Sequence, residues 1–346
     1  MPGVATTPLA RGKTELAPRW RLDAKDYVAA MDITRDGRWC AIATGSGEVL
    51  VVDVDTGAVR SRAMAHPQGA LEVAFARDGA TFITCGQDAS AKLFATSGAL
   101  LRELPGGSAW VEHAAWSPSG DRLATASGRR VRFWTPAGEP VVETEPLPST
   151  VTAIAWDRKG TQLAAICYGG VYILGATVAA KTRHLAWKGS LISLAWSPDG
   201  KVIACGSQDN SVHFWRLATG EDSEMRGYPF KPRALEWDGQ SSLLATAGDA
   251  AVCVWDFAGK GPEGSTPIQL EGHKAVCTRL AFSPRKGVLA SGAQDTSVLL
   301  WEPRRGTKPI RYAFLEDEIT ALRWHPEHRG LLGGDAAGNV VYWNIS

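Results

Sequence analysis

The stretch that decides the fold is VIACGSQDNSVHFW, at residues 202–215. Two near-copies occur, FITCGQDASAKLF at residues 82–94 and VLASGAQDTSVLLW at residues 288–301. Weaker copies end at Val52, Trp134, Leu174, Trp255 and Trp343, so one copy follows another roughly every 40 residues. A fixed period of this length indicates a chain built from repeated supersecondary units.

A tight turn precedes the end of each copy. The turns read ITRDG, FARDG, WSPSG, WDRKG, WSPDG, WDGQS, FSPRKG and WHPEHRG, and they start at Ile33, Phe75, Trp116, Trp156, Trp196, Trp237, Phe282 and Trp324. Asp-Gly and Ser-Pro-x-Gly favour hairpin turns, because Gly adopts positive φ and Pro fixes the entry angle. Each copy therefore predicts a strand a before the turn, strands b and c after it, and a looser strand d. We number the copies repeats one to eight in chain order.

Composition and charge exclude several classes of protein. The 346 residues are 45% hydrophobic, and 37 Lys+Arg against 36 Asp+Glu leave a formal net charge of +1, so nucleic-acid binding is not expected. The six cysteines form no CxxC pair, which favours reduced thiols and a cytoplasmic location. No apolar run is long enough for a membrane span, and we expect no membrane contact. The 14 Trp, 37 Gly and 19 Pro favour short strands separated by turns, and hence an all-β fold.

Four short antiparallel strands cannot bury both of their faces alone. Repeats of this kind stack face to face, and closing the stack into a ring removes the exposed edges. The sequence therefore predicts an all-β propeller.

The chain resembles the WD-repeat family in particular details. Trp255-Asp256 ends strand c of repeat six, Gly272-His273 precedes strand a of repeat seven, and an Asp lies six residues before the aromatic of several c strands. The resemblance implies that a His, a Ser or Thr, an Asp and a Trp of one repeat form a hydrogen-bonded chain, which we call the brace. Repeat seven matches fully with His273, Ser291, Asp295 and Trp301, and repeat two matches with His66, Thr84 and Asp88 but ends in Phe94, which has no N–H. In repeat five Cys205 and Trp187 interrupt the brace.

Counting complete a–b–c units predicts eight blades of four antiparallel strands, with seven blades as the alternative that the resemblance implies. The eighth unit ends without a strand d, and Arg19-Trp20-Arg21-Leu22 at the start of the chain is placed to complete it. We expect a flexible tail at residues 1–18 and a single propeller domain at residues 19–346, monomeric by default.

Candidate catalytic and metal-binding groups have ordinary structural roles in this pattern. The recurrent Asp residues before strand c are expected to brace turns, and His325 and His328 lack a third ligand for zinc. Cofactors and metals are therefore not expected. Strand a is mostly apolar near the axis, at Ala29, Val73, Ala114, Ala153 and Leu194, which argues against an enzyme.

The d–a loops and b–c turns lie on one rim of a propeller, which we call the upper rim. Side chains there that the repeat does not require are the candidate partner-binding residues: Tyr27, Trp110, Arg129, Arg130, Lys231, Arg233, Lys274, Glu316, Asp317 and Glu318. Exposed aromatic and Arg side chains are common interface hot spots. The opposite, lower rim is basic but diluted by Asp, and a phosphate-binding surface there is the less favoured interpretation. The sequence thus predicts a non-catalytic scaffold that binds a protein or peptide, with a propeller enzyme or small-ligand binder using the central channel as the alternative.

Overall fold

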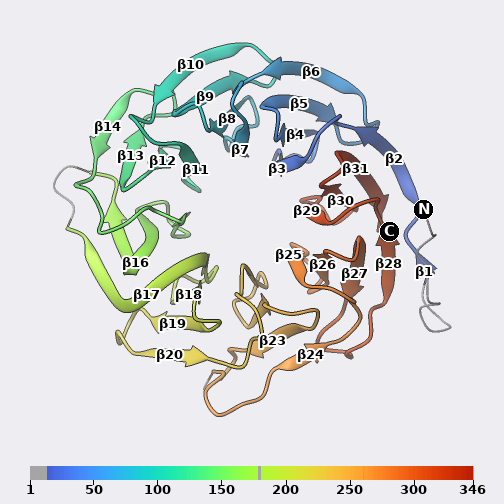
Figure 1. Ribbon diagram of the computed structural model, residues 1–346. Coiled ribbons are helices and arrows are strands. Elements are labelled where there is room, and N and C mark those ends of the chain that lie inside the picture. The colour runs from blue at the N-terminus through green and yellow to red at the C-terminus, as the bar shows by residue number, and fades with distance from the viewer. Residues whose placement is uncertain (1–13, 178–180, 260, 346) are drawn as a thin grey trace.

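The chain folds as an all-β propeller around a central axis (Figure 1). The structure, a computed structural model, describes residues 14–177, 181–259 and 261–345. Within these ranges the regular secondary structure consists of strands and contains no helix. The apolar residues of the central strands pack between neighbouring sheets, and the resulting core is divided into clusters that follow the ring.

Repeats one to three each form a four-stranded antiparallel sheet, in which strand a is innermost and strand d outermost (Figure 1). Their strands are β3 (Val28–Ile33), β4 (Trp39–Thr44), β5 (Glu48–Asp53) and β6 (Val59–Met64); β7 (Ala70–Phe75), β8 (Thr81–Gly86), β9 (Ser90–Ala95) and β10 (Leu100–Pro105); and β11 (Val111–Trp116), β12 (Leu123–Ser127), β13 (Arg130–Trp134) and β14 (Pro140–Glu143).

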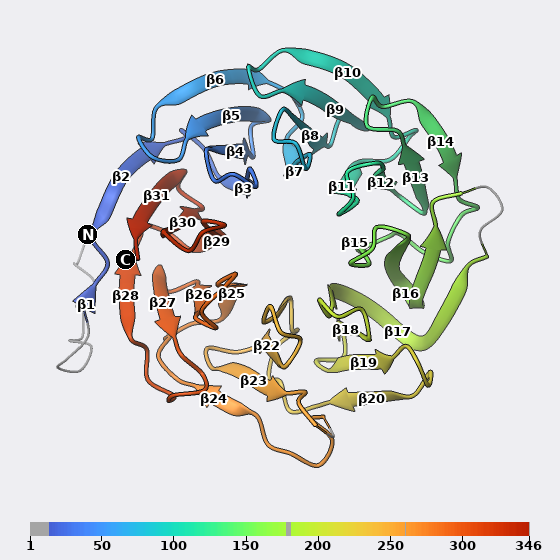
Figure 2. The same cartoon turned by 180° about the vertical axis from the view of Figure 1, so that it is seen from behind.

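Repeats four and five share one six-stranded sheet, seen from behind in Figure 2. Its strands are β15 (Ala153–Trp156), β16 (Gln162–Gly175), β17 (Arg183–Trp196), β18 (Val202–Ser207), β19 (Val212–Arg216) and β20 (Asp222–Met225). Strand β16 carries b and c of repeat four, and β17 carries d of repeat four and a of repeat five. Each runs for 14 residues, so β17 extends from the outer edge of the ring to its inner side without a loop.

The last three sheets complete the ring. They contain β21 (Ala234–Trp237), β22 (Leu243–Ala247), β23 (Val252–Asp256) and β24 (Ile268–Leu270); β25 (Cys277–Phe282), β26 (Leu289–Ala293), β27 (Ser297–Trp301) and β28 (Arg311–Phe314), to which β1 (Thr14–Glu15) is added; and β29 (Ile319–Trp324), β30 (Gly330–Asp335) and β31 (Asn339–Asn344), to which β2 (Pro18–Asp23) is added.

The main prediction of eight blades is not supported, because the strands of the described residues form seven hydrogen-bonded sheets, the number given by the alternative. The physical reason is the continuity of β17, which pairs with β16 of repeat four along one part of its length and with β18 of repeat five along the other, with a register shift in each pairing. The seven sheets carry all eight copies of the sequence repeat. Their inner strands contact one another in a closed cycle, in the order β3, β7, β11, β15, β17, β21, β25, β29 and back to β3.

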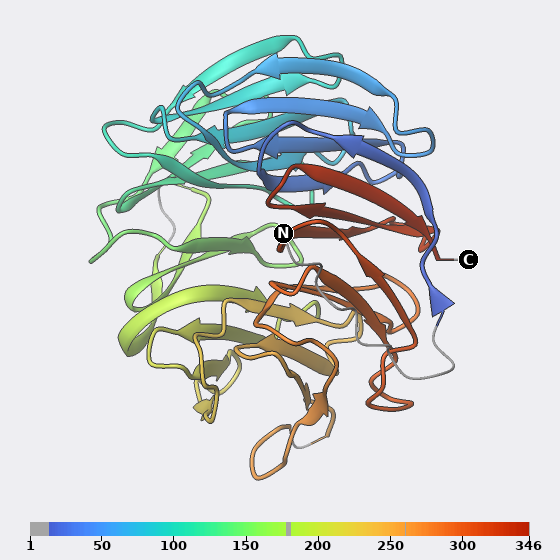
Figure 3. The same cartoon turned by 45° about the vertical axis from the view of Figure 1, so that its right-hand side comes forward.

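The ring is closed by the start of the chain, as the sequence predicted. Strand β2 pairs antiparallel with β31, with Trp20 opposite Tyr342 and Leu22 opposite Val340, and so supplies the outer strand of repeat eight. Figure 3 shows β2 running along the outside of this sheet. Residues 1–13 of the expected tail lie outside the described residues. The next residues do not match a free tail, since β1 pairs in parallel with β28 and Leu16 is buried.

Candidate functional site

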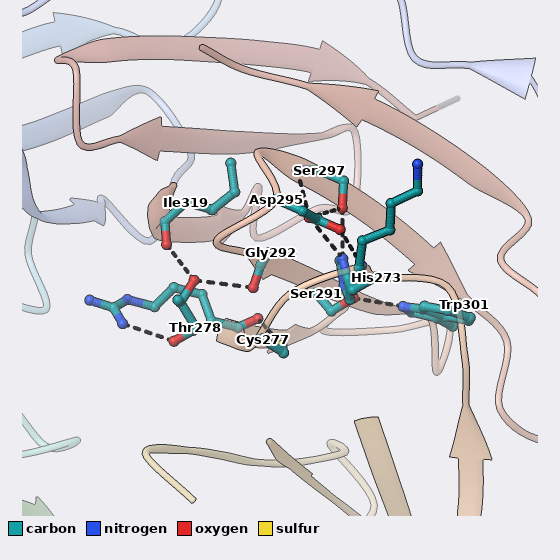
Figure 4. Close-up of polar contacts among 11 residues, drawn as sticks. His273, Cys277, Thr278, Ser291, Gly292, Asp295, Ser297, Trp301 and Ile319 are labelled. Carbon is teal, nitrogen blue, oxygen red and sulfur yellow. Dashed lines mark hydrogen bonds and ion pairs between the residues drawn. The ribbon is translucent and has the colours of Figure 1, made fainter. Parts of the chain in front are cut away.

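The brace of repeat seven is present and contains one more member than the sequence indicated (Figure 4). Trp301 Nε1 donates to Ser291 Oγ at 2.8 Å, and Ser291 Oγ lies 2.6 Å from His273 Nε2. On the other side of the ring, His273 Nδ1 lies 2.7 Å from Ser297 Oγ, which donates to Asp295 at 2.5 Å. Asp295 itself lies 3.5 Å from His273 Nδ1, so Ser297 bridges the expected direct contact.

The other repeats vary the brace according to the side chains available. In repeat two, His66 contacts Asp88 and Thr84, each at 2.8 Å, and Lys92 adds an ion pair to Asp88 at 3.0 Å. In repeat six, Tyr228 replaces His: its hydroxyl lies 2.7 Å from Thr246 Oγ1 and accepts a hydrogen bond from Trp255. The polar role of Tyr228 was not predicted from the sequence, although the Trp-Asp ending of repeat six was a signal that could have indicated it.

Repeat five has no working brace. Trp187 packs against His213 with their ring centroids 3.9 Å apart and their planes tilted by 30°. The Trp187 indole N–H and both ring nitrogens of His213 are buried without a hydrogen-bond partner among the described residues. Asp222 lies 2.9 Å from His213 Nε2 but outside hydrogen-bond alignment. Burial lowers the pKa of His213 more than the Asp222 charge raises it.

Four exposed aromatic side chains lie on the upper rim, from four different repeats. Tyr27 and Trp110, both predicted, are 38% and 50% exposed in d–a loops. Phe230, in the d–a loop that leads to β21, is 53% exposed, and Tyr168, at the hairpin turn inside β16, is 54% exposed. The sequence analysis missed Phe230 and Tyr168, although Tyr168-Gly169-Gly170 is a turn with an unneeded aromatic.

The acidic residues of repeat eight lie next to the Tyr27 loop. Asp335, in the b–c turn of repeat eight, accepts hydrogen bonds from the backbone N–H groups of Glu316 and Asp317, whose side chains are exposed. In the same turn, Gly338 packs against the backbone of Asp26, the residue before Tyr27. The structure therefore brings Glu316, Asp317 and the half-buried Glu318 to the same part of the rim as Tyr27.

The basic candidates divide into two groups. In repeat three, Arg130 pairs with Glu143 at 2.8 Å and Arg129 donates to the carbonyl of Leu147 at 2.5 Å, so both guanidinium groups have local partners. Lys231 and Arg233 flank the turn into β21 and are exposed, as is Lys274 at the start of repeat seven. Lys231 and Arg233 follow Phe230 closely in the sequence, so one loop presents an aromatic side chain and two cations.

The prediction of apolar inner strands at the channel is wrong. Val73 and Ala114 are buried between sheets, whereas the alternate positions of the inner strands carry Asp32, Glu72, His113, Glu236, Arg279 and Arg323. Strand alternation explains the error, because Val73 and Ala114, which we assigned to the axis, point into the core.

Some of these charged groups join neighbouring inner strands. Asp32 accepts the backbone N–H of Phe75 at 2.7 Å, and Glu72 accepts that of Ala114 at 3.1 Å while lying 3.3 Å from His113. Burial raises the pKa of Glu236 to about 7, even though Arg323 acts in the opposite direction. Arg279 and Arg323 form no ion pair within 4.0 Å in the described part of the chain.

Comparison with known proteins agrees with the repeat pattern. Residues 98–135, 180–216 and 264–302 match the family described as WD domain, G-beta repeat. These three segments of the chain match WD40 repeats. Among curated WD40-repeat relatives, the WD repeat-containing protein srw1 of Schizosaccharomyces pombe is 29% identical over 241 residues, which cover 64% of this chain and 41% of srw1.

Two further similarities place the WD40 repeats in context. The probable cytosolic iron-sulfur protein assembly protein 1 of Mycosarcoma maydis is 32% identical over 208 residues, or 59% of this chain and 37% of the relative. The alignments thus span about two fifths of the length of these relatives. The crystal structure of the computationally designed Ika8 protein matches 96% of this chain and all of its own with a TM-score of 0.80, and its 20% identity supports the fold alone.

The WD40 repeats of this chain show no metal-binding group or membrane helix in the part that the structure describes. There, no three His, Cys, Asp or Glu side chains cluster as metal ligands, and no helix has the length and hydropathy to cross a membrane. The HxxH pair is instead engaged locally: His325 accepts the N–H of Glu327, and His328 contacts Ser283.

Proposed function

We propose that this protein is a non-catalytic scaffold whose upper rim binds a protein or peptide partner. The observation that carries the proposal is the collection of Tyr27, Trp110, Tyr168 and Phe230 on one rim, each more than a third exposed. Aromatic side chains dominate interface hot spots, and none of these four takes part in a brace. WD40 proteins generally serve as protein-interaction scaffolds, which supports the same function.

Charge would orient the partner on this rim. The acidic residues Glu316, Asp317 and Glu318 adjoin Tyr27, whereas Lys231 and Arg233 adjoin Phe230 in repeat six. Opposed charges steer association and fix register more than they add affinity. The proposed partner therefore carries a basic segment near repeats eight and one and an acidic segment near repeat six.

We further propose that residues 19–346 act as one cytoplasmic, monomeric domain with eight radial units, two of them fused in the six-stranded sheet. The closed cycle of inner strands and the pairing of β2 with β31 support one domain. Sedimentation equilibrium tests the monomer, and limited proteolysis tests the single domain, since a domain boundary would yield two stable fragments.

The test of rim binding is affinity purification of tagged protein with quantitative mass spectrometry, followed by affinity measurement on the partner recovered. We expect Trp110→Ala to weaken binding by about 30-fold, because an interface aromatic contributes about 2 kcal/mol. A variant with Ala at 316, 317 and 318 should mainly slow association. Phe314→Ala, on the outer strand β28 and 37% exposed, is the matched control and should bind normally. Equal binding by all three variants would show that the partner does not bind through the upper rim.

The channel supports a second candidate function, the binding of a small ligand. Its favouring observation is the set of inner-strand charges, in which Arg323 is exposed and has no carboxylate within 4.0 Å among the described residues. A thermal-shift screen of small carboxylates on the protein and on Arg323→Gln would test it. Stabilisation lost in the variant supports a channel site, and the absence of any hit rejects it.

A further inference from the structure

A cavity of about 650 Å³ lies on the lower rim between repeats four and five. Its apolar wall comes from Ile173 in β16, Trp196 at the end of β17 and Leu217 after β19. Its polar wall consists of Asp157, Arg158, Lys159, Thr161, Gln162, Arg183, Asp199 and Gly200. The cavity is separate from the upper rim, since these residues belong to a–b turns and to the ends of strands c and d.

The junction at this cavity lacks a hydrogen bond that four equivalent junctions of the ring have. At Trp116, Trp156, Trp237 and Trp324, the indole N–H donates to a carbonyl of the preceding inner strand, at 2.9–3.2 Å. Trp196 occupies the same position, but its indole N–H is buried and has no hydrogen-bond partner in the part of the chain that the structure describes. This is also the junction where β17 crosses between the two repeats without a loop.

The carboxylates at the cavity are already engaged, whereas two of its cations are not. Asp157 accepts hydrogen bonds from the backbone of Thr161 and Gln162, and Asp199 accepts that of Lys201. Arg183 donates to the carbonyl of Leu217 at 3.0 Å. Arg158 and Lys159 form no hydrogen bond or ion pair among the described residues.

We propose that this cavity binds a small organic anion. The apolar body of the ligand lies against Trp196, Ile173 and Leu217, and its carboxylate or phosphate group meets Arg158 and Lys159. The volume lies within the usual range for small-molecule sites, about 300–1,000 Å³, and the combination of an apolar wall with a few polar groups is typical of them. Charge-assisted hydrogen bonds from Arg and Lys are the strong contacts for either anion.

A second basic cavity, of about 560 Å³, provides the control. It lies between repeats six and seven. It contains Arg285 and Lys286 in the a–b turn of repeat seven, the counterpart of the turn that carries Arg158 and Lys159 in repeat four. Its lining has no aromatic side chain, and Leu243 and Pro284 are its main apolar residues. Binding driven by positive charge alone would therefore occur at both cavities, whereas the proposed ligand requires the first.

The experiment measures phenyl phosphate binding by titration calorimetry, with benzoate, benzyl alcohol and inorganic phosphate as separate arms. We expect phenyl phosphate or benzoate to bind, and the tighter-binding compound shows whether the site prefers a phosphate or a carboxylate group. Benzyl alcohol and inorganic phosphate should bind at least about tenfold more weakly. Arg158→Gln with Lys159→Gln should weaken binding at least about tenfold, and Arg285→Gln with Lys286→Gln should leave it unchanged. Equal losses in both double variants, or no binding of either aromatic anion, would overturn the proposal.

A second pair of variants guards against loss of folding. Leu217→Glu places a negative charge at the cavity and should abolish binding, whereas Leu217→Gln should reduce it only modestly. Glu and Gln differ little in size, so any loss of stability caused by replacing Leu217 should be similar in the two variants and should not explain a difference in binding. Equal affinities for Leu217→Glu and Leu217→Gln would contradict an anion in this cavity. Since the upper-rim variants do not alter these residues, failure here leaves the proposed scaffold function unaffected.

Discussion

Asp295 anchors the brace of repeat seven through Ser297 and the backbone. Burial raises the pKa of Asp295, but its interactions with His273, with Ser297 and with the N–H of Lys274 outweigh burial and hold that pKa well below its usual range. A carboxylate with a depressed folded-state pKa stabilises the fold above its unfolded pKa of about 4, and that contribution is lost as the pH falls through the depressed value.

The first prediction compares Asp295 with its counterpart in repeat five. Asp295→Ala should lower the free energy of unfolding by about 1–3 kcal/mol, because the replacement leaves buried donors without an acceptor. Asp209→Ala should cost less, since Asp209 accepts hydrogen bonds from Ser211 but joins no His. Urea denaturation of both variants measures the difference, and equal losses would show that the brace is not its cause.

The second prediction concerns His213. Burial lowers the pKa of His213, so protonation below about pH 6.5 favours the unfolded chain and stability falls as the pH falls. His213→Phe removes this titration and the buried unpaired nitrogens. We expect a smaller drop in melting temperature between pH 8 and pH 5.5 than in the parent chain, with the exposed His184→Phe as control. A drop as large as the parent's would exclude His213 as a contributor.

At the residue scale, the resemblance to the WD-repeat family, applied at the repeat spacing, predicted the brace members that lie at fixed positions. His273, Ser291 and Trp301 fell where the period required them. Ser297 and Tyr228 were missed, because the shape of the folded ring decides whether a hydroxyl comes within hydrogen-bond distance. The exposure of Phe230 and Tyr168 was unpredictable for the same reason.

At the element scale, the turns were predictable and the strand lengths were not. Positive-φ glycines occur where the Asp-Gly and Ser-Pro-x-Gly patterns predicted them, at Gly37, Gly79, Gly120 and Gly200. The fusion of repeats four and five was not predictable, because the continuity of β17 depends on the backbone hydrogen bonds that it makes to β16 and β18 in the folded ring, which the repeat spacing does not encode. The pairing of β1 with β28 was missed for the same reason.

The third prediction removes β2. Deleting residues 1–26 exposes the outer edge of β31, with loss of its ladder hydrogen bonds and of the packing of Trp20 and Leu22. The melting temperature should fall by several degrees. Deleting residues 1–13 keeps both β1 and β2 and should have a much smaller effect. An unchanged melting temperature in the longer deletion would show that β2 does not contribute to closure.

At the scale of the whole molecule, closure turns a linear array of repeats into a ring. Open repeat arrays unfold in parts, because each unit contacts only its neighbours. Here repeat eight packs against the repeats on both of its sides, because its inner strand β29 contacts β25 of repeat seven and β3 of repeat one. The core consequently has no terminal unit with one uncovered face.

The fourth prediction is that unfolding of the closed ring is one cooperative transition. Far-ultraviolet circular dichroism and Trp fluorescence should report coincident urea midpoints for the full chain. In the chain without residues 1–26, the midpoints should separate, because repeat eight can open before the rest. Separate midpoints already in the full chain would mean that closure does not couple the units.

The pairing of β2 with β31 also has a consequence for biosynthesis, because the two strands are synthesised at different times. Residues 18–23 of β2 are made before their partner residues 339–343, by roughly tens of seconds at about 5–20 residues per second. During that interval β2 is an unpaired strand in a crowded cell. Arg19, Arg21 and Asp23 alternate along it, and such charges discourage pairing with foreign strands. The charges of β2 thus protect the nascent chain until β31 is made.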